Sequence, residues 1–473
     1  MNNSIIIEGL GTGHAVMRPL SLILDSGTGT PVADPVGTAE GMAREGGLVI
    51  LTSNERDHVA AASGLSGVIP VLVGAAGNPL ADAGLVRARN LAALAPLAQE
   101  TAAILQLARF RPSDFRARQQ AAIAALCQAI TAAGGIMVYG AGNIGRQAVD
   151  AARRAGLPVA AVLDANASRH GTLFEGVEIR PPQAIEPGRS VVVPALGRAV
   201  GTVKAHLRAL GVRDIMSLSQ LYALSRRPGE PETDYLDDLY ANRWRYLSLY
   251  CMVADDRSRV AIDAIIRHRL TLETEPCAGI CEHDHPQWFD PSFLPRRLDD
   301  VFVDAGAHDG DTVEGYIKAQ GDGFRHIDAF ELDPVLVETA RRRIGDDPRV
   351  RFHTLGLSNG PGEVCFRPTG GTDGTIAVTP GEGTRVRLGS IDDHVTMPAT
   401  YIKIDVEGME ALVLEGARRQ IATNRPMLGV AAYHKAQDLW DLPRRILDID
   451  AGYRIHFRHY TDVAYETVLY AQP

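Results

Sequence analysis

Apolar runs that end in glycine or acidic residues recur along residues 299–473, and amphipathic stretches separate them. DVFVDAG, HIDAFELD, TYIKIDVEG and PMLGVAA are examples. Such runs are typical of strands buried on both faces of a parallel sheet, with a helix in each connection. The last two runs, YRIHFRHY and YETVLYA, are close in sequence and predict a hairpin with one antiparallel strand. The pattern therefore predicts an α/β fold with a mainly parallel sheet.

The same alternation occurs upstream. SIIIEGLG and the strand, helix, strand pattern of GGLVILTSNERDHVAAASGLSGVIPVLVG begin the chain, and a helical, alanine-rich pattern runs from Leu80 to about Ala133. GIMVYGAGNIGRQAVDAARRAG and PVAAVLDA resume the strand and helix alternation, whereas 226–298 is rich in aromatic and charged residues and predicts helices. We expect a multidomain chain with four segments: 1–130 of unknown role, 131–225, a helical connector at 226–298, and 299–473.

Composition limits the classes of function. The chain has 473 residues, 45% hydrophobic and 22% charged, which are ordinary values for a globular protein. A formal charge of −9 argues against a nucleic-acid partner. MNNSIIIEGLG lacks the features of a signal peptide, and no apolar run approaches the roughly 20 residues that span a bilayer. Five cysteines are too few for a disulfide framework, so we expect a cytoplasmic protein without stable membrane insertion.

VFVDAGAHDG predicts a buried strand that ends at Asp304 and enters a glycine turn. Gly306 and Gly310 would let bare backbone approach a ligand, and His308 between them would pack or hydrogen-bond near it. A turn without a ligand is the alternative.

The second strand of this unit, HIDAFELDP, ends in Glu331, which is placed to accept hydrogen bonds from both hydroxyls of a ribose. The glycine spacing departs from G-x-G-x-x-G because the last glycine comes one position late. Asp304 and Asp309 would repel a pyrophosphate but suit an amino group and a sulfonium. These features favour S-adenosylmethionine over NAD.

Five ordered blocks in residues 299–473, somewhat over a third of the chain, resemble the FkbM family of S-adenosylmethionine-dependent methyltransferases. They are VFVDAGAHDGDT, FELDP, YIKIDVEGMEALVLEGA, YHKAQDLWDLP and FRHYTDVAYETVLYA. The resemblance implies a class I methyltransferase fold and O-methylation of a sugar, a glycan or a related hydroxylated metabolite.

An alcohol needs help to lose its proton during methyl transfer. Asp405 and His434 each follow a predicted strand and are our catalytic candidates, since reactive groups gather at the carboxyl ends of parallel strands. Asp405 and Glu407, two residues apart, would share a face of an extended chain and could hold Mg²⁺. Alternatively, these two acids cap a helix that begins at Gly408, and His434 is an ordinary loop histidine.

A second glycine turn, VYGAGNIGRQ, matches G-x-G-x-x-G with Gly140, Gly142 and Gly145, and Asp164 ends the next strand. The segment resembles Rossmann-like domains of bacterial polysaccharide enzymes, which implies a nucleotide or nucleotide-sugar ligand. We favour binding or a structural role over hydride chemistry, because no acid–base pair lies nearby in the sequence.

The cluster Cys277, Cys281, His283 and His285 has residue types that bind zinc, but its spacing is not a usual zinc-site pattern, so a polar loop is the favoured interpretation. Three hypotheses for the whole chain remain: an O-methyltransferase, a catalytically inactive binding or scaffold protein with this fold, or a methyltransferase fused to an NAD-dependent enzyme.

Overall fold

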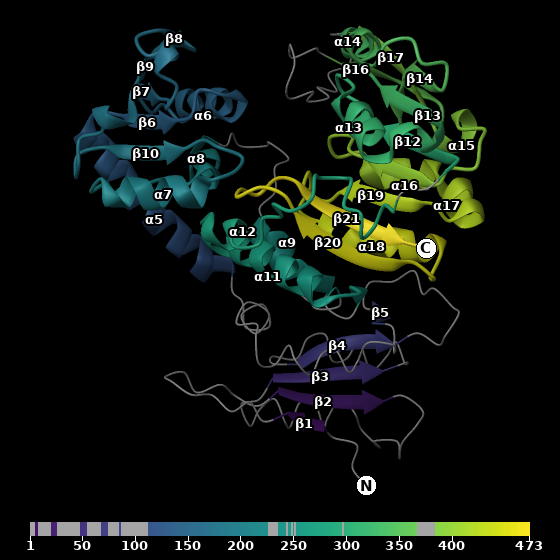
Figure 1. Cartoon of the computed structure of the whole chain (residues 1–473). Coiled ribbons are helices and arrows are strands. Elements are labelled where there is room, and N and C mark those ends of the chain that lie inside the picture. Colours follow the sequence, from purple (N-terminus) through teal and green to yellow (C-terminus); the bar gives the residue numbers. More distant parts are fainter. Residues whose placement is uncertain are drawn as a thin grey trace.

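The computed structural model (Figure 1) describes residues 112–225, 235–242, 245–246, 249, 252–295, 298–366 and 384–473, and the backbone of five strands nearer the N-terminus. These strands form a sheet in the order β1-β2-β3-β4-β5, parallel except for β1. They are β1 (Ile5–Ile7), β2 (Leu20–Asp25), β3 (Leu48–Ser53), β4 (Val68–Val73) and β5 (Leu85–Val86). Strand β5 corrects the prediction of a continuous helical pattern from Leu80. The helix expected between β3 and β4 lies outside the described residues.

The middle of the chain forms a six-stranded sheet in the order β11-β10-β6-β7-β9-β8, parallel except for the pair β8 and β9. Its elements are α5 (Pro112–Ala133), β6 (Ile136–Tyr139), α6 (Asn143–Arg154), β7 (Val159–Leu163), β8 (Leu173–Phe174), β9 (Val177–Arg180), β10 (Val191–Pro194), α7 (Val200–Ala209), β11 (Asp214–Ile215) and α8 (Leu218–Ser225). The boundary expected at residue 130 falls inside α5, where Ile130 is buried in the core of this unit.

The C-terminal part contains a seven-stranded sheet in the order β14-β13-β12-β18-β19-β21-β20. Its strands and main helices are β12 (Asp300–Ala305), α13 (Asp311–Gln320), β13 (Phe324–Glu331), α14 (Pro334–Ile344), β14 (Val350–Thr354), β18 (Tyr401–Ile404), α16 (Glu410–Gly416), α17 (Arg418–Asn424), β19 (Met427–Ala431), α18 (Asp438–Ile449), β20 (Arg454–His459) and β21 (Thr467–Gln472). Strand β21 runs antiparallel to both its neighbours. The predicted α/β class and the final antiparallel strand are therefore confirmed.

The strand order reverses beside β12, because the chain proceeds from β12 to β13 on one side and reaches β18 on the other side. Ligands of open α/β sheets bind outside the carboxyl ends of the strands at such a switch point. A smaller sheet of β15 (Gly356–Leu357), β17 (Thr384–Gly389) and β16 (Gly362–Phe366), followed by α15 (Ile391–His394), lies after β14 in sequence. A ligand is therefore expected outside the carboxyl ends of β12 and β18.

Of the connector helices, α11 (Asp256–Thr271) lies against β20 of the C-terminal sheet, and α9 (Tyr235–Ala241) contributes to the same core, whereas α12 (Glu275–Ala278) contacts α11 and α7 of the middle unit (Figure 1). Ile262 and Ile266 of α11 belong to the same buried apolar cluster as Phe457 of β20. Within the part of the chain that the structure describes, the connector shares its core with the C-terminal sheet.

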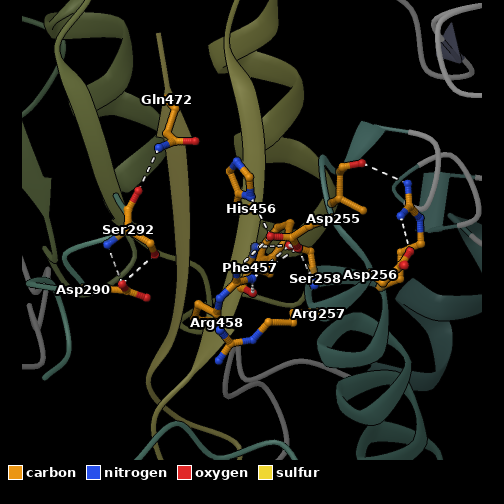
Figure 2. A network of polar contacts seen from close by, with 12 residues as sticks. Asp255, Asp256, Arg257, Ser258, Asp290, Ser292, His456, Phe457, Arg458 and Gln472 are labelled. Atoms are coloured by element: carbon orange, nitrogen blue, oxygen red, sulfur yellow. Dashed lines mark hydrogen bonds and ion pairs between the residues drawn. The ribbon is translucent and has the colours of Figure 1, made fainter. Parts of the chain in front are cut away.

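Polar contacts fix α11 on β20 (Figure 2). The Asp255 carboxylate accepts a hydrogen bond from the backbone N–H of Ser258 at 2.8 Å and so caps α11. It also lies 2.9 Å from Nδ1 of His456 and 2.7 Å from Nη2 of Arg458, two almost fully buried side chains of β20. Burial alone would raise the pKa of Asp255, but hydrogen bonds from His456, Arg458 and Ser258 outweigh it and hold that pKa below its usual range.

The loop between β20 and β21 touches the middle unit, toward which the hairpin points in Figure 1. The N–H of Asp462 donates to the carbonyl of Gly197 at 2.9 Å, and Nε of Arg198 donates to the carbonyl of Tyr460 at 3.1 Å. Gly197 and Arg198 follow β10 at the carboxyl edge of the middle sheet.

Every helix within the described ranges is too short or too polar to cross a membrane.

Candidate functional site

The first glycine turn is packed too closely for any side chain. Gly306 has φ +85°, and a Cβ atom there would lie 1.8 Å from the carbonyl oxygen of Asp405. Gly310 also has φ +85°, and a Cβ there would meet the Cβ of Ala340 at 2.9 Å. Both positions need glycine for their conformation and for the close approach. The turn after β12 therefore lies directly against the backbone that follows β18.

Asp304, at the end of β12, is fully buried, and its Oδ1 lies 3.0 Å from Nζ of Lys403 on the neighbouring strand. Lys403 also donates to the carbonyl of Gly306 at 2.5 Å. Burial raises the pKa of Asp304 to about 6 although Lys403 opposes the shift. Burial disfavours charge on Lys403, but the carboxylates of Asp304 and Asp405 outweigh it and raise its pKa. Near pH 7 Asp304 and Lys403 form a buried ion pair, and Lys403 holds the glycine turn in place through its bond to the carbonyl of Gly306.

Glu331 is the last residue of β13 and is half-buried beside the turn. Its Oε2 accepts a hydrogen bond from the backbone N–H of His308 at 3.0 Å, and its Oε1 accepts one from Asp333 at 2.9 Å. A carboxylate has about four lone-pair sites, so Glu331 retains capacity for two hydroxyl donors. His308 has φ +47° and an exposed side chain, so its backbone rather than its ring positions Glu331.

Five polar side chains meet beside the turn, after β18 and β19. Nε2 of His434 lies 3.6 Å from Oδ1 of Asp405 and 3.5 Å from Oε2 of Glu407, and its Nδ1 lies 2.9 Å from Oε1 of Glu410. The Tyr433 hydroxyl donates to Oδ1 of Asp405 at 3.4 Å. The His434 side chain is 11% exposed and that of Glu407 is 54% exposed, so the cluster has one open side.

The chain bends where the sequence pattern suggests a straight segment. Glu407 has φ +53°, so Asp405 and Glu407 do not share a face of an extended strand, and this step of the sequence argument is wrong. The helix begins at Glu410 rather than at Gly408, and its N-cap residue makes no side-chain cap. The expected helix start is therefore wrong, whereas stabilisation of the helix dipole by these two acids stays an open alternative. Their carboxylates nevertheless converge on His434.

Charge in this cluster is mainly negative. Burial disfavours a charged His434, but the hydrogen bond with Glu410 and the carboxylates of Glu410, Asp405 and Glu407 raise its pKa to about 9. Burial and the nearby Asp405 raise the pKa of Glu466 to about 7. Glu466 precedes β21 and accepts a hydrogen bond from Gln287.

The structure thus brings together Asp304, Gly306, Gly310, Glu331, Asp405, Glu407 and His434 from the sequence-based set. It adds Lys403, Glu410 and Glu466, which the sequence analysis missed. For Lys403 the only signal in the sequence is a lysine inside an apolar strand. For Glu410 it is a second glutamate directly after E-G-M.

The second glycine turn is also tightly packed. A Cβ at Gly145 would lie 1.9 Å from the carbonyl oxygen of Gly140, and one at Gly140 would lie 2.7 Å from that of Ala195. Gly142 has open space around it. Asp164 accepts a hydrogen bond from the N–H of Ala141 at 3.2 Å and pairs with Arg169 at 3.3 Å. Close packing accounts for two of the three glycines, and nucleotide binding at this turn remains a prediction.

The cysteine and histidine cluster does not assemble. Among the described residues, only two groups of metal-ligating side chains come together: Asp405, Glu410 and His434, and His308, Asp309 and Asp311. Cys277 is buried, and burial raises the pKa of its thiol to about 12.

Comparison with known proteins agrees with this geometry. Residues 304–455 match the methyltransferase FkbM domain. The match supports a methyltransferase, and it spans the glycine turn, Glu331 and the acid cluster. No curated protein matches the chain.

One solved structure shares the fold over a longer part of the chain. A methyltransferase FkbM from Methylobacillus flagellatus KT aligns with a TM-score of 0.56 and 24% identity, over 76% of this chain and 100% of that chain. Such coverage exceeds residues 304–473, so the shared fold includes part of the upstream chain. The precorrin-6y C5,15-methyltransferase from Geobacter metallireducens GS-15 aligns over 38% of this chain and 84% of its own, with 16% identity and a TM-score of 0.25. Fibrillarin from Aeropyrum pernix, with natively bound S-adenosyl-L-methionine, aligns over 37% and 67%, with 12% identity and a TM-score of 0.25.

Proposed function

We propose that the protein transfers the methyl group of S-adenosylmethionine to a hydroxyl oxygen of a sugar, a glycan or a related metabolite. The methyl donor would lie outside the ends of β12 and β13, with its ribose on Glu331 and its adenosyl part beside the turn from Gly306 to Gly310. This placement follows the position of ligands at the switch point of open α/β sheets.

One observation carries the proposal: the backbone at Gly306 and the carbonyl of Asp405 are so close that a Cβ on Gly306 would lie 1.8 Å from that carbonyl oxygen. The turn expected to hold the methyl donor and the acid cluster expected to hold the acceptor therefore adjoin. Methyl transfer needs this adjacency, because the acceptor oxygen must approach the sulfonium methyl in line with the bond that breaks.

The chemistry assigns distinct roles to the cluster. The new bond joins the acceptor oxygen to the methyl carbon, the sulfur–methyl bond breaks, and the acceptor proton must leave. We assign the Asp405 carboxylate as the group that takes this proton. His434, whose ring is oriented by Glu410, is the second group that we expect to contact the acceptor.

A sugar-like acceptor suits the residues around the cluster. Tyr433 donates to Asp405 and presents an aromatic ring beside His434, with ring centroids 4.2 Å apart. An aromatic ring with a polar end can pack on the apolar face of a sugar while neighbouring carboxylates accept its hydroxyls. The resemblance of residues 299–473 to the FkbM family supports the same class of acceptor.

The test is incubation of the full chain with methyl-labelled S-adenosylmethionine and a panel of nucleotide sugars and oligosaccharides. We expect label in the acceptor, and we expect Asp405→Asn and His434→Ala to lower kcat by about 10²–10⁴-fold. Calorimetric affinity for the methyl donor should stay within about threefold of wild type, which separates loss of chemistry from loss of fold. Absence of donor binding by the wild-type chain would contradict the proposal.

A further inference from the structure

The His434 ring is held so that one nitrogen faces an anchored carboxylate and the other faces two more. Oε1 of Glu410 lies 2.9 Å from Nδ1, and it also accepts the N–H groups of Val406 at 3.0 Å and Gly408 at 3.1 Å. A carboxylate can only accept, so Nδ1 carries the hydrogen. Nε2 then points toward Asp405 and Glu407.

Nε2 faces two carboxylates, so positive charge must lie among these groups, either as a second proton on the ring or as a bound cation. The distances of 3.5–3.6 Å from Nε2 to the carboxylate oxygens are longer than ordinary hydrogen bonds, as expected for ligands that surround a cation. Asp405, Glu410 and His434 also offer one ligand atom each within 4.8 Å of one another. Of the acids around the ring, Asp405 and Glu407 face Nε2, whereas Glu410 faces Nδ1.

A second observation comes from Glu410. Its side chain is fully buried, and its Oε2 has no hydrogen-bond partner. A buried anionic oxygen without a partner is costly, and a neighbouring cation offsets that cost. Glu407 also adopts φ +53°, an uncommon conformation for a residue other than glycine, and it keeps its carboxylate on His434.

We propose that Asp405, Glu407 and His434 bind a first-row divalent cation, with Nε2 of His434 as the nitrogen ligand and Glu410 as the outer carboxylate that orients the ring. Ligating histidines usually donate their other N–H to a carboxylate in this way. An imidazole together with carboxylates favours Mn²⁺ and its neighbours, whereas the Mg²⁺ expected from Asp405 and Glu407 alone requires only oxygen ligands. The proposal rests on these side chains and not on methyl transfer.

The other group of ligating side chains in the described residues provides a control. Asp309 in that group already pairs with Arg343 at 2.5 Å, and His308 and Asp311 are exposed. None of the proposed ligands belongs to this second group, whose Asp311 is the first residue of α13, so Asp311→Asn should not affect a cation held by Asp405 and Glu407.

The experiment is titration of the metal-free full chain with Mn²⁺, followed by electron paramagnetic resonance of the free ion, without methyl donor or acceptor. We expect one Mn²⁺ per chain. Glu407→Gln, at a half-exposed position that a fold tolerates, should weaken binding at least tenfold. Glu410→Gln should weaken it by about 10- to 100-fold. Asp311→Asn should stay within about twofold of wild type, and circular dichroism should show the same fold in all variants.

Three results would overturn the proposal: no Mn²⁺ bound by the wild-type chain, equal affinity in Glu407→Gln, or competitive displacement of Mn²⁺ by S-adenosylmethionine. The last result would mean that the acids serve the sulfonium instead. Because metal binding is measured without an acceptor, its failure is distinguishable from failure of the proposed methyl transfer, which the labelled-donor assay tests alone.

Discussion

Replacement of Gly306 by alanine tests the link between the glycine turn and the acid cluster. The added Cβ would lie 1.8 Å from the carbonyl oxygen of Asp405, whereas ordinary contact begins near 3.4 Å. The backbone must therefore shift by roughly 1.5 Å, a rearrangement of the kind that costs about 1–3 kcal/mol in a packed core. The positive φ of +85° adds about 1–2 kcal/mol for a residue with a Cβ. We expect a total loss of about 2–5 kcal/mol in the free energy of unfolding.

Gly345 is the matched control. It has φ +81° at the end of α14, and a Cβ there would meet nothing within 4 Å. Its ψ of −166° lies in a region that residues with a Cβ rarely adopt, so Gly345→Ala should lose only the conformational part, about 1–3 kcal/mol. Denaturant unfolding gives both values, and calorimetry gives the affinity for S-adenosylmethionine. We expect at least tenfold weaker binding for Gly306→Ala and unchanged binding for Gly345→Ala. Equal stability and equal affinity in the two variants would refute the reasoning.

Three further outcomes follow from the contacts. Lys403→Met leaves the Asp304 carboxylate buried without its partner and should cost about 3–5 kcal/mol of unfolding free energy at pH 7, whereas Lys318→Met, in an exposed pair, should cost less than about 1 kcal/mol. The lowered pKa of Asp255 stabilises the fold fully above its unfolded pKa of about 4. Asp255→Asn should therefore be about 1–3 kcal/mol less stable at pH 7. This difference from wild type should shrink progressively as the pH falls below about 4 toward the lower folded pKa, which denaturant unfolding at several pH values measures. Glu331→Gln should weaken binding of S-adenosylmethionine by about 10- to 100-fold in calorimetry, and unaltered affinity would remove Glu331 from the ribose site.

The sheet that carries the site was predictable from sequence because its strands are nearly continuous apolar runs. β12, β18 and β19 are buried along their whole length, and polar residues follow each of them in the loop at the carboxyl edge. The antiparallel β21 was predictable from the short connection after β20. β5 was missed because two apolar residues in an alanine-rich stretch carry too little periodicity to distinguish a strand from a helix.

Most residues of the site were predictable from the sequence, but the contacts between them were not. The pairing of Lys403 with Asp304 depends on the register between β12 and β18, which are separated by almost a hundred residues and have no sequence signal for their alignment. Glu410 was missed because its side chain folds back onto the loop N–H groups before the helix, although its sequence position is typical of an exposed helix start. Glu407 reached His434 through a left-handed bend that residue spacing does not reveal.

The most direct test of the central claim is a crystal structure of the full chain with S-adenosylmethionine. We predict density for the donor outside β12 and β13, with ribose hydroxyls on Glu331 and the sulfonium methyl directed toward Asp405 and His434. Donor bound at the turn from Gly140 to Gly145, or a C-terminal crevice without donor at saturating concentration, would contradict the account.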